Sequence, residues 1–466
     1  MAPTADISHD FASFAANTRY EDLPEAAVEA AKKSLLDTLG VMLAASGMEP
    51  AVRPILETVL ENGGQEQATI IGFGKRVPSS QAAFVNGALA HGLDFDSQTP
   101  WGAHPDSSVV PTVLALAEKR GGVSGKELIR AIAIGQELFI RLRCNVGWHM
   151  DWNLSTAVGC FSATAAGAAV MGLDTPTIAR ALGIASMQSA GTMEQIFGIG
   201  SDLRGMYAGF TSQGCVNAVL LAAKGMTGID GLFEGEAGLF KVYFKGEYNR
   251  EAMLKDLGSE FLCGGMTYKY WPAVGNAHTY IHAAIELMRE NNVALEDVEK
   301  IRVYCGDFAI RMCVPLEKRQ VPGTLVDAKF SLPFLVALAL TKRQMNISDF
   351  TQAALRESAV LMLARKVTPV LDPAFNWNGR LPDGKVEITL TGGRTISRLG
   401  SHVPGTPDNP MTWDQIGWKF KDCASAAIHP VDANSASRAI DLVQKLEAQD
   451  SSVISALFST VSGGVA

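Results

Sequence analysis

Residues 91–106 of this 466-residue chain, HGLDFDSQTPWGAHPD, bring several ionisable side chains into one short segment. These side chains are His91, Asp94, Asp96, His104 and Asp106. Imidazole and carboxylate groups transfer protons in many active sites, because burial and neighbouring charges tune their pKa values. Turn or cap roles for the aspartates and a structural role for the histidine are the alternatives for each residue alone. The whole cluster exceeds what capping needs, which favours a functional site here.

His104 is the candidate acid–base group, because an imidazole with an ordinary pKa of about 6.5 can take and give a proton near neutral pH. Asp94 would orient His104 or the substrate. Lys269, in the segment YKYWP, is the second proton-transfer candidate, since its aromatic neighbours would partly desolvate the ammonium. An exposed lysine stacked on an aromatic ring is the alternative. Arg204 would hold a carboxylate through two parallel hydrogen bonds, or would be an ordinary surface or ion-pair arginine.

These residue types suit proton transfer next to a carboxylate. Such chemistry eliminates water, reprotonates the carbanion left by loss of CO2, or inverts a carbon centre. Asp94, Asp96 and His104 could also bind a metal ion through oxygen and imidazole ligands. The chain has no H-E-x-x-H or other closely spaced ligand pair, so we expect no metal and no other cofactor.

Several other classes of protein are disfavoured. GFGKR after ATII lacks the third glycine of a dinucleotide loop, and there is no G-x-S-x-G or Walker sequence. A net charge of −8 without basic–aromatic runs argues against nucleic-acid binding. Without an apolar stretch of about 18 residues or a secretory signal, we expect no membrane span and a cytoplasmic location. The 7 scattered cysteines are typical of reduced core thiols.

The cluster is flanked by segments that read as helices. SSQAAFVNGALAHGLD enters it, and SSVVPTVLALAEKRG leaves it. Residues 1–265 as a whole read as almost continuous helix, with apolar residues at helical spacing in segments such as KELIRAIAIGQELFIRLR. Many of these segments are rich in Ala and Gly, which lets helix axes approach closely. We therefore expect buried central helices that hold the cluster at both ends.

The pattern changes after residue 265. VEKIRVYCG and GKVEITLTGGRTISR alternate in the way that strands do, the second as a hairpin turning at Gly392 and Gly393, whereas AKFSLPFLVALAL and TQAALRESAVLMLARKV read as helix. From about Pro404 the pattern returns to helix. We predict a mainly α fold in which a large helical domain, 1–265 completed by 404–466, carries a smaller α+β domain over 266–403.

The segment from HGLDFD through HP, followed by VSGKELIRAIAIGQELFIRL, resembles the MmgE/PrpD family. Further matches follow in the family's order: RGMYAGFTSQGCVNAVLLAAKGMTG, YKYWPAVGNAHTYIHAAIEL, AKFSLPFLVALAL and NPMTWDQIGWKF. The resemblance covers nearly the entire chain. It implies a helical domain built from both ends of the chain, an inserted α+β lid and homodimers. It also implies an enzyme that acts on small carboxylic acids without a metal ion.

The family's active-site histidine in a G-F/W-H segment can be matched to GWHMDWNLSTAVG in two ways. With the downstream glycine fixed, Asn153 takes its place. With GWH matched, His149 does, and about four residues are inserted. Four residues make about one helical turn, so His149 could still face the same side if the segment is helical.

Other positions either match the family's motifs or differ from them. His278 matches the histidine of K-x-x-P…H, and its spacing from the proline places it inside the following helix. Arg204 stands where the family usually has lysine, which keeps the charge and alters the geometry. Gln98 replaces a threonine, and Phe334 replaces a tyrosine. These two losses argue against the strict site of a cis-aconitate decarboxylase and leave the identity of the acid open. Gln98, His278 and either Asn153 or His149 are the candidates for binding it.

Our leading hypothesis is a cofactor-independent lyase, either a dehydratase or a decarboxylase, that acts on a small di- or tricarboxylate. The runner-up is an epimerase or isomerase that uses His104 and Lys269 as opposed acid and base on one carbon. A third hypothesis is a non-catalytic relative that binds carboxylates, which Asn153, Phe334 and Gln98 would suit.

Overall fold

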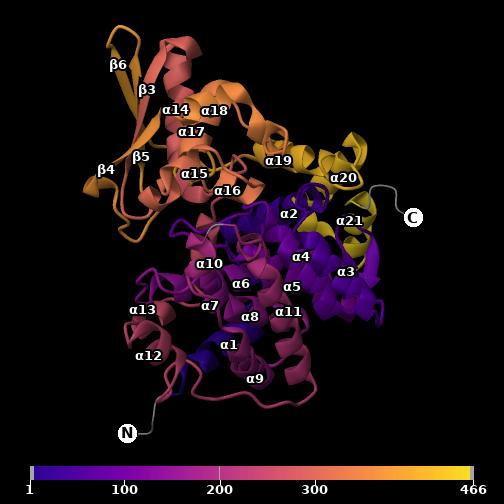
Figure 1. Cartoon of the computed structure of the whole chain (residues 1–466). Helices are drawn as coiled ribbons and strands as arrows, with labels where there is room; N and C mark the ends of the chain where they lie inside the picture. The colour runs from indigo at the N-terminus through magenta and orange to yellow at the C-terminus, as the bar shows by residue number, and fades with distance from the viewer. Residues whose placement is uncertain (1–4, 199, 462–466) are drawn as a thin grey trace.

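The computed structural model describes residues 5–198 and 200–461, which build two hydrophobic cores. Figure 1 shows a helical body made of the first part of the chain and the yellow C-terminal helices, with a smaller orange part above it that contains a sheet. The larger core draws on residues from Ile7 to Val461, and the smaller one on residues 271–403. The predicted mainly α fold with a smaller α+β part is confirmed, while the boundaries at 265/266 and 403/404 stay a prediction.

The helical body takes its elements from both ends of the chain. Its helices are α1 (Ile7–Asn17), α2 (Glu25–Met48), α3 (Val52–Asn62), α4 (Ser79–Gly92), α5 (Asp106–Arg120), α6 (Gly125–Cys144), α7 (Leu154–Ala157), α8 (Gly159–Val170), α9 (Thr175–Ala185), α10 (Glu194–Phe197), α11 (Leu203–Ala223), α12 (Leu239–Phe244), α13 (Arg250–Leu254), α19 (Trp413–Ser425), α20 (Ala433–Gln444) and α21 (Val453–Val461). Among the described residues no single helix is long and apolar enough to cross a membrane; α2 and α3 pass that test only together, across a 93° bend.

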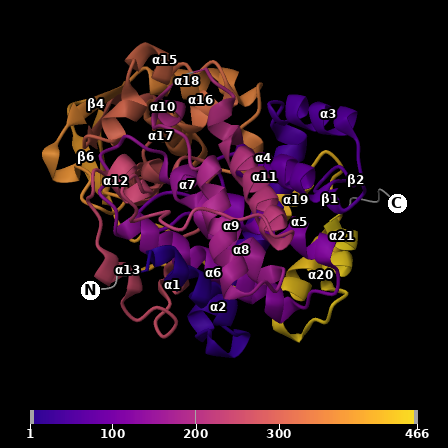
Figure 2. The same ribbon diagram turned by 90° about the horizontal axis from the view of Figure 1, so that it is seen from below.

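Small residues let the helices in the middle of the body pack closely. Every residue of the Ala-rich helix α8 is buried, and Figure 2 shows α8 beside α9 and α11 near the centre of the body. A Cβ atom at Gly87 in α4 would lie 2.7 Å from the Ala208 carbonyl oxygen, and one at Gly209 in α11 would lie 2.5 Å from that of Phe84. Glycine is therefore required where α4 and α11 touch, which confirms the expected close packing.

The first 265 residues are less continuously helical than expected. Strands β1 (Ala68–Ile70) and β2 (Lys75–Val77) form a short antiparallel hairpin. The glycines of GFGKR, Gly72 and Gly74, have φ values of 81° and 63°, a backbone region that favours glycine. These glycines make a hairpin turn, whose three-residue strands are too short to show a period of two.

The smaller part has a four-stranded sheet in the order β4-β3-β5-β6. Its elements are α14 (His278–Asn291), β3 (Val298–Cys305), α15 (Leu316–Gln320), α16 (Leu325–Lys329), α17 (Leu332–Lys342), α18 (Ser358–Ala364), β4 (Val367–Leu371), β5 (Gly384–Leu390) and β6 (Thr395–Gly400). β3 pairs parallel with β4 and antiparallel with β5, which forms the predicted hairpin with β6. The helix predicted for TQAALRESAVLMLARKV is wrong at both ends. Only α18 in its second half is α-helix, its first half forms turns, and buried Val367 pairs with Ile301 and begins β4.

Candidate active site

The loop between α4 and α5 carries the cluster found in the sequence. His91 lies in the last turn of α4, and His104 lies just before α5 begins at Asp106. Asp94 has a φ of 47°, a left-handed conformation that is uncommon for a residue other than glycine. The Asp94 backbone N–H donates to the His91 carbonyl oxygen at 2.8 Å, which closes a tight turn after the helix. The turn directs the loop back toward the end of α4.

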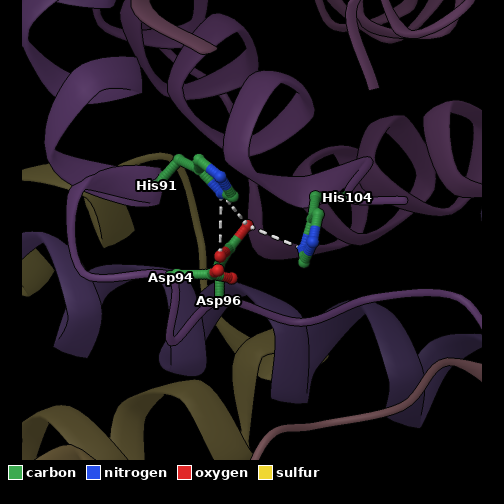
Figure 3. A group of neighbouring side chains, drawn as sticks. All are labelled: His91, Asp94, Asp96 and His104. Atoms are coloured by element: carbon green, nitrogen blue, oxygen red, sulfur yellow. Dashed lines mark hydrogen bonds and ion pairs between the residues drawn. The ribbon is translucent and has the colours of Figure 1, made fainter. Parts of the chain in front are cut away.

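Asp96 lies between two imidazoles (Figure 3). His91 Nδ1 is 3.0 and 3.1 Å from its two carboxylate oxygens, and His104 Nδ1 is 3.3 Å from Oδ2. Burial alone would raise the pKa of Asp96, but the positive charge and hydrogen bonds of His91 and His104 lower it well below its ordinary value. Asp96 is therefore ionised and accepts from both rings.

The contacts of His104 define which of its ring nitrogens is free. Its Nδ1 is 2.9 Å from the Ser97 carbonyl oxygen, and a carbonyl can only accept a hydrogen bond. The proton of a neutral ring is therefore on Nδ1, so we assign the lone pair to Nε2. Its backbone N–H donates to Ser155 Oγ at 3.0 Å, which ties the loop to α7. His104 is held in place with one ring nitrogen available for proton transfer.

Lys269 reaches the same loop from 175 positions further along the chain. Its Nζ donates to the Asp94 carbonyl oxygen at 2.9 Å, forms an ion pair with the Asp94 carboxylate, and lies 3.9 Å from Asp96 Oδ1. Burial opposes the charge of Asp94, but Lys269 and the two histidines lower the Asp94 pKa below its ordinary value. Lys269 is buried, as expected, and its partner is Asp94.

Lys419 of α19 fixes the two segments that carry this pair. Its Nζ donates to the Phe95 carbonyl oxygen at 2.7 Å and to the Lys269 carbonyl oxygen at 3.0 Å. It also forms a 2.7 Å ion pair with Asp37 of α2. Helix α19 from the last part of the chain and helix α2 from the first part therefore meet at this loop, which joins both ends of the chain in the body.

A cavity lined by His104 opens between the two parts of the fold. Residues of both hydrophobic cores or their flanking loops line it, including Leu154 from the body and Phe330 from the smaller part. Its polar lining residues are His91, Asp94, Gln98, His104, Arg143, Asn153, Ser155, Tyr207 and Asn276. Its larger apolar lining residues are Trp101, Trp148, Leu154, Met193, Ile196, Val274, Phe308, Phe330 and Trp377. A concave, mostly apolar site with a few polar groups is typical of a small-molecule pocket.

Of the two residues that could match the family histidine, Asn153 lines the cavity and His149 does not. Asn153 caps α7 by accepting from the Ser155 N–H at 3.0 Å, and its Nδ2 has no partner among the described residues. His149 is exposed and pairs with Glu247 at 2.8 Å. The segment around His149 is not helical, so the condition under which it would face the same side is not met.

Gln98 and His278 lie at a second cavity that adjoins the first. The backbone of Gln98 pairs with Thr267, and its side chain packs against Gly275, so that it lines both cavities. His278 begins α14 and lines only the second, as does Lys269. Burial lowers the pKa of His278 to about 3, so its imidazole is neutral at physiological pH.

Arg204 of α11 is buried with its guanidinium over the ring of Phe330. Its Nε and Nη1 have no hydrogen-bond partner in the described part of the chain. Burial lowers its pKa to about 9, so it stays positive at neutral pH. It is not an ion-pair arginine in this structure, and it lies behind the cavity wall that Phe330 forms.

Asp106 is the member of the sequence cluster that has a structural role. Its carboxyl group accepts from Ser97 Oγ at 2.5 Å and from Gln136 Nε2 at 2.8 Å, away from the cavity lining. Burial raises its pKa to about 6.

The other four members of the cluster place one possible ligand atom each within 4.8 Å of one another, a spacing that a metal ion could bridge. Asp94 is instead paired with Lys269, and Asp96 lies within hydrogen-bond distance of the two imidazoles.

The sequence indicates His91 only as a member of the cluster and Asp96 only as a possible metal ligand, and it does not indicate Arg143 or Tyr207. Tyr207 packs beside the His91 ring, with centroids 4.4 Å apart, and burial raises its pKa well above the ordinary value. The spacing of His91 five residues before Asp96 could have indicated their contact across a turn. Basic residues such as Arg143 are common at the C-terminus of a helix, so its position in the sequence does not indicate that it lines a cavity.

The chain belongs to the MmgE/PrpD family. The model of the family's N-terminal domain matches residues 9–251, and that of its C-terminal domain matches residues 271–447. A cis-aconitate decarboxylase of Aspergillus terreus is 26% identical over 95% of this chain and 93% of its own length. The human cis-aconitate decarboxylase is 23% identical, over 97% and 94%. A 2-methylcitrate dehydratase of Cupriavidus necator is 25% identical over 83% of each protein.

Proposed function

We propose that this protein is a cofactor-independent lyase, a dehydratase or decarboxylase of a small di- or tricarboxylate. The observation that carries the proposal is His104, oriented by Asp96 and Ser97, in the lining of the same cavity as Asp94, whose carboxylate pairs with Lys269. The names of the relatives add support, because they describe a decarboxylation and a dehydration of related acids.

Either reaction needs one group that takes a proton and one that gives a proton. In a dehydration, His104 Nε2 would take a proton from the carbon next to a carboxylate, and the Asp94–Lys269 pair would protonate the departing hydroxyl group. In a decarboxylation, the C–C bond breaks, CO2 leaves, and one of these groups protonates the carbanion. Asn153 Nδ2 and Gln98 would donate hydrogen bonds to the substrate, and Arg204 would supply positive charge behind Phe330.

The experiment that tests the proposal incubates the purified protein in D2O with citrates, aconitates, tartrates and amino-dicarboxylates and follows each by NMR. A new alkene or CO2 supports a lyase. Altered stereochemistry at unchanged carbon skeleton, with deuterium incorporation, would instead show an epimerase or isomerase. Thermal stabilisation by an acid without turnover or exchange would show a carboxylate-binding relative. His104→Gln protein serves as the control for contaminating activity.

Chelation is expected to leave the turnover of this protein within about twofold of the untreated value. The physical reason is that Asp94 already has Lys269 as its ion-pair partner and Asp96 contacts two imidazoles, whereas removal of a catalytic Lewis acid costs several kcal/mol. Turnover after exhaustive dialysis against EDTA is the measurement. A large loss that Mg²⁺ or Mn²⁺ restores would contradict the proposal and make the two aspartates metal ligands.

A further inference from the structure

Arg143 lies in the last turn of α6 and lines the same cavity as His104. Its Nη2 donates to the Trp101 carbonyl oxygen at 2.7 Å. Trp101 is three residues before His104, so their Cα atoms are at most about 11 Å apart. Arg143, Trp101 and His104 all line this one cavity. Arg143 and His104 can therefore contact two ends of one small molecule.

The charge of Arg143 has no acidic partner among the described residues. It is only 7% exposed, and it makes no ion pair with any acidic residue in the part of the chain that the structure describes. Burial lowers its pKa to about 10, which leaves it positive at neutral pH. A buried charge without a partner is unfavourable, and the nearby acids, Asp94 and Asp96, are already paired. This arrangement is stabilised if a bound anion supplies the missing charge.

Two tryptophans orient the guanidinium. Its carbon atom lies 5.0 Å from the ring centroid of Trp148 and 5.8 Å from that of Trp377. The two indoles meet edge to face, with centroids 5.6 Å apart. Trp377 comes from the connection between β4 and β5, so both parts of the fold enclose Arg143. Aromatic groups that pack on a guanidinium leave its N–H edge for a planar acceptor such as a carboxylate.

We propose that Arg143 binds a second carboxylate of the substrate, at the tryptophan-lined end of the cavity. The substrate class is then a polycarboxylate in which one carboxylate lies beside the reacting carbon at His104 and another reaches Arg143. This inference rests on the proposed function for the position of the reacting end. Arg143 is a specificity-determining residue: it selects acids with a distal carboxylate.

The test measures binding of two unreactive acids that share a five-carbon chain, propane-1,2,3-tricarboxylate and pentanoate. Their Kd values are determined by NMR titration for the wild-type protein, Arg143→Gln and Arg143→Lys. We expect Arg143→Gln to raise the Kd for the tricarboxylate by about 10- to 100-fold, the factor for a lost hydrogen bond to a charged group. The Kd for pentanoate should stay within about twofold of the wild-type value. Arg143→Lys should give a Kd for the tricarboxylate between those of the wild type and Arg143→Gln. Lysine keeps the positive charge but cannot form the two parallel hydrogen bonds of a guanidinium.

Arg130→Gln is the matched control, since Arg130 lies on the same helix, away from the cavity, and donates to the carbonyl oxygens of Thr18 and Ala169. It should leave both Kd values unchanged. An Arg143→Gln protein that binds the tricarboxylate normally, or that loses both acids equally because the loop is disturbed, overturns the proposal. If the wild type binds neither acid, the proposal for Arg143 fails, whereas the lyase activity is decided separately by turnover of the acids in D2O. Arginine-dependent binding without turnover of any acid would overturn only the lyase activity.

Discussion

Replacing His104 by Gln is expected to lower kcat by about 10²–10⁴, the usual contribution of one positioned proton-transfer group. The amide can still donate to the Ser97 carbonyl oxygen, but it has no nitrogen that takes and gives a proton near neutral pH. The side chain is partly exposed at the cavity, so the melting temperature should stay close to that of the wild type. Steady-state kinetics and thermal unfolding of both proteins measure the two effects.

His9→Gln is the control for this substitution, because His9 is exposed on α1 and lies outside the cavity. It should retain wild-type kinetics. Near-wild-type kcat in His104→Gln at an unchanged melting temperature would show that the proton-transfer group lies elsewhere. His91 would then be the next candidate, since its Nδ1 is held by Asp96 in the same way and it also lines the cavity.

The sequence predicts those parts of the fold and the site that depend on local patterns. The helices on both sides of the 91–106 loop follow from apolar spacing, and the β5–β6 hairpin follows from alternation around Gly392 and Gly393. The loop itself was recognisable because its ionisable residues are close in sequence. The helix predicted across Val367 was wrong because its β-branched end completes a sheet whose other strand lies far away in the chain.

The parts of the site that depend on distant contacts could not be predicted in detail. The sequence indicates that Lys269 is desolvated. It does not indicate that Asp94, 175 positions earlier, accepts a hydrogen bond from its ammonium group. Arg143 reaches the cavity because α6 ends beside Trp101, which no local pattern encodes. His149 and Asn153 could not be separated until the backbone between them proved to be an irregular loop.

Replacing Lys269 by Met is expected to lower both kcat and stability, in contrast to His104→Gln. Its ammonium is fully buried, so its loss leaves the Asp94 carboxylate buried without its ion-pair partner. Breaking a buried pair in this way costs about 3–5 kcal/mol of unfolding free energy. The variant should lower kcat by a factor of about 10²–10⁴, because the Asp94–Lys269 pair can no longer give a proton. Urea unfolding and steady-state kinetics measure the two quantities.

Asp94→Asn in the Lys269→Met background separates the structural role of the pair from the catalytic one. Removing the charge of Asp94 should recover a large part of the lost stability, since no uncompensated carboxylate remains, whereas kcat should stay low. The pH dependence has a defined sign. The Asp94 pKa is lowered in the folded protein, so the stabilisation is complete above the unfolded-state pKa of about 3.9 and disappears as the pH falls through the folded-state value.

The stability difference between the wild type and Lys269→Met should therefore narrow on acidification. A difference that stays constant down to the acid transition would show that Lys269 stabilises the fold without Asp94. The double variant His104→Gln, Lys269→Met tests the shared step, because residues that act as a unit lose rate non-additively. Its kcat should fall little below that of the slower single variant, and a fully multiplicative loss would assign His104 and Lys269 to separate steps.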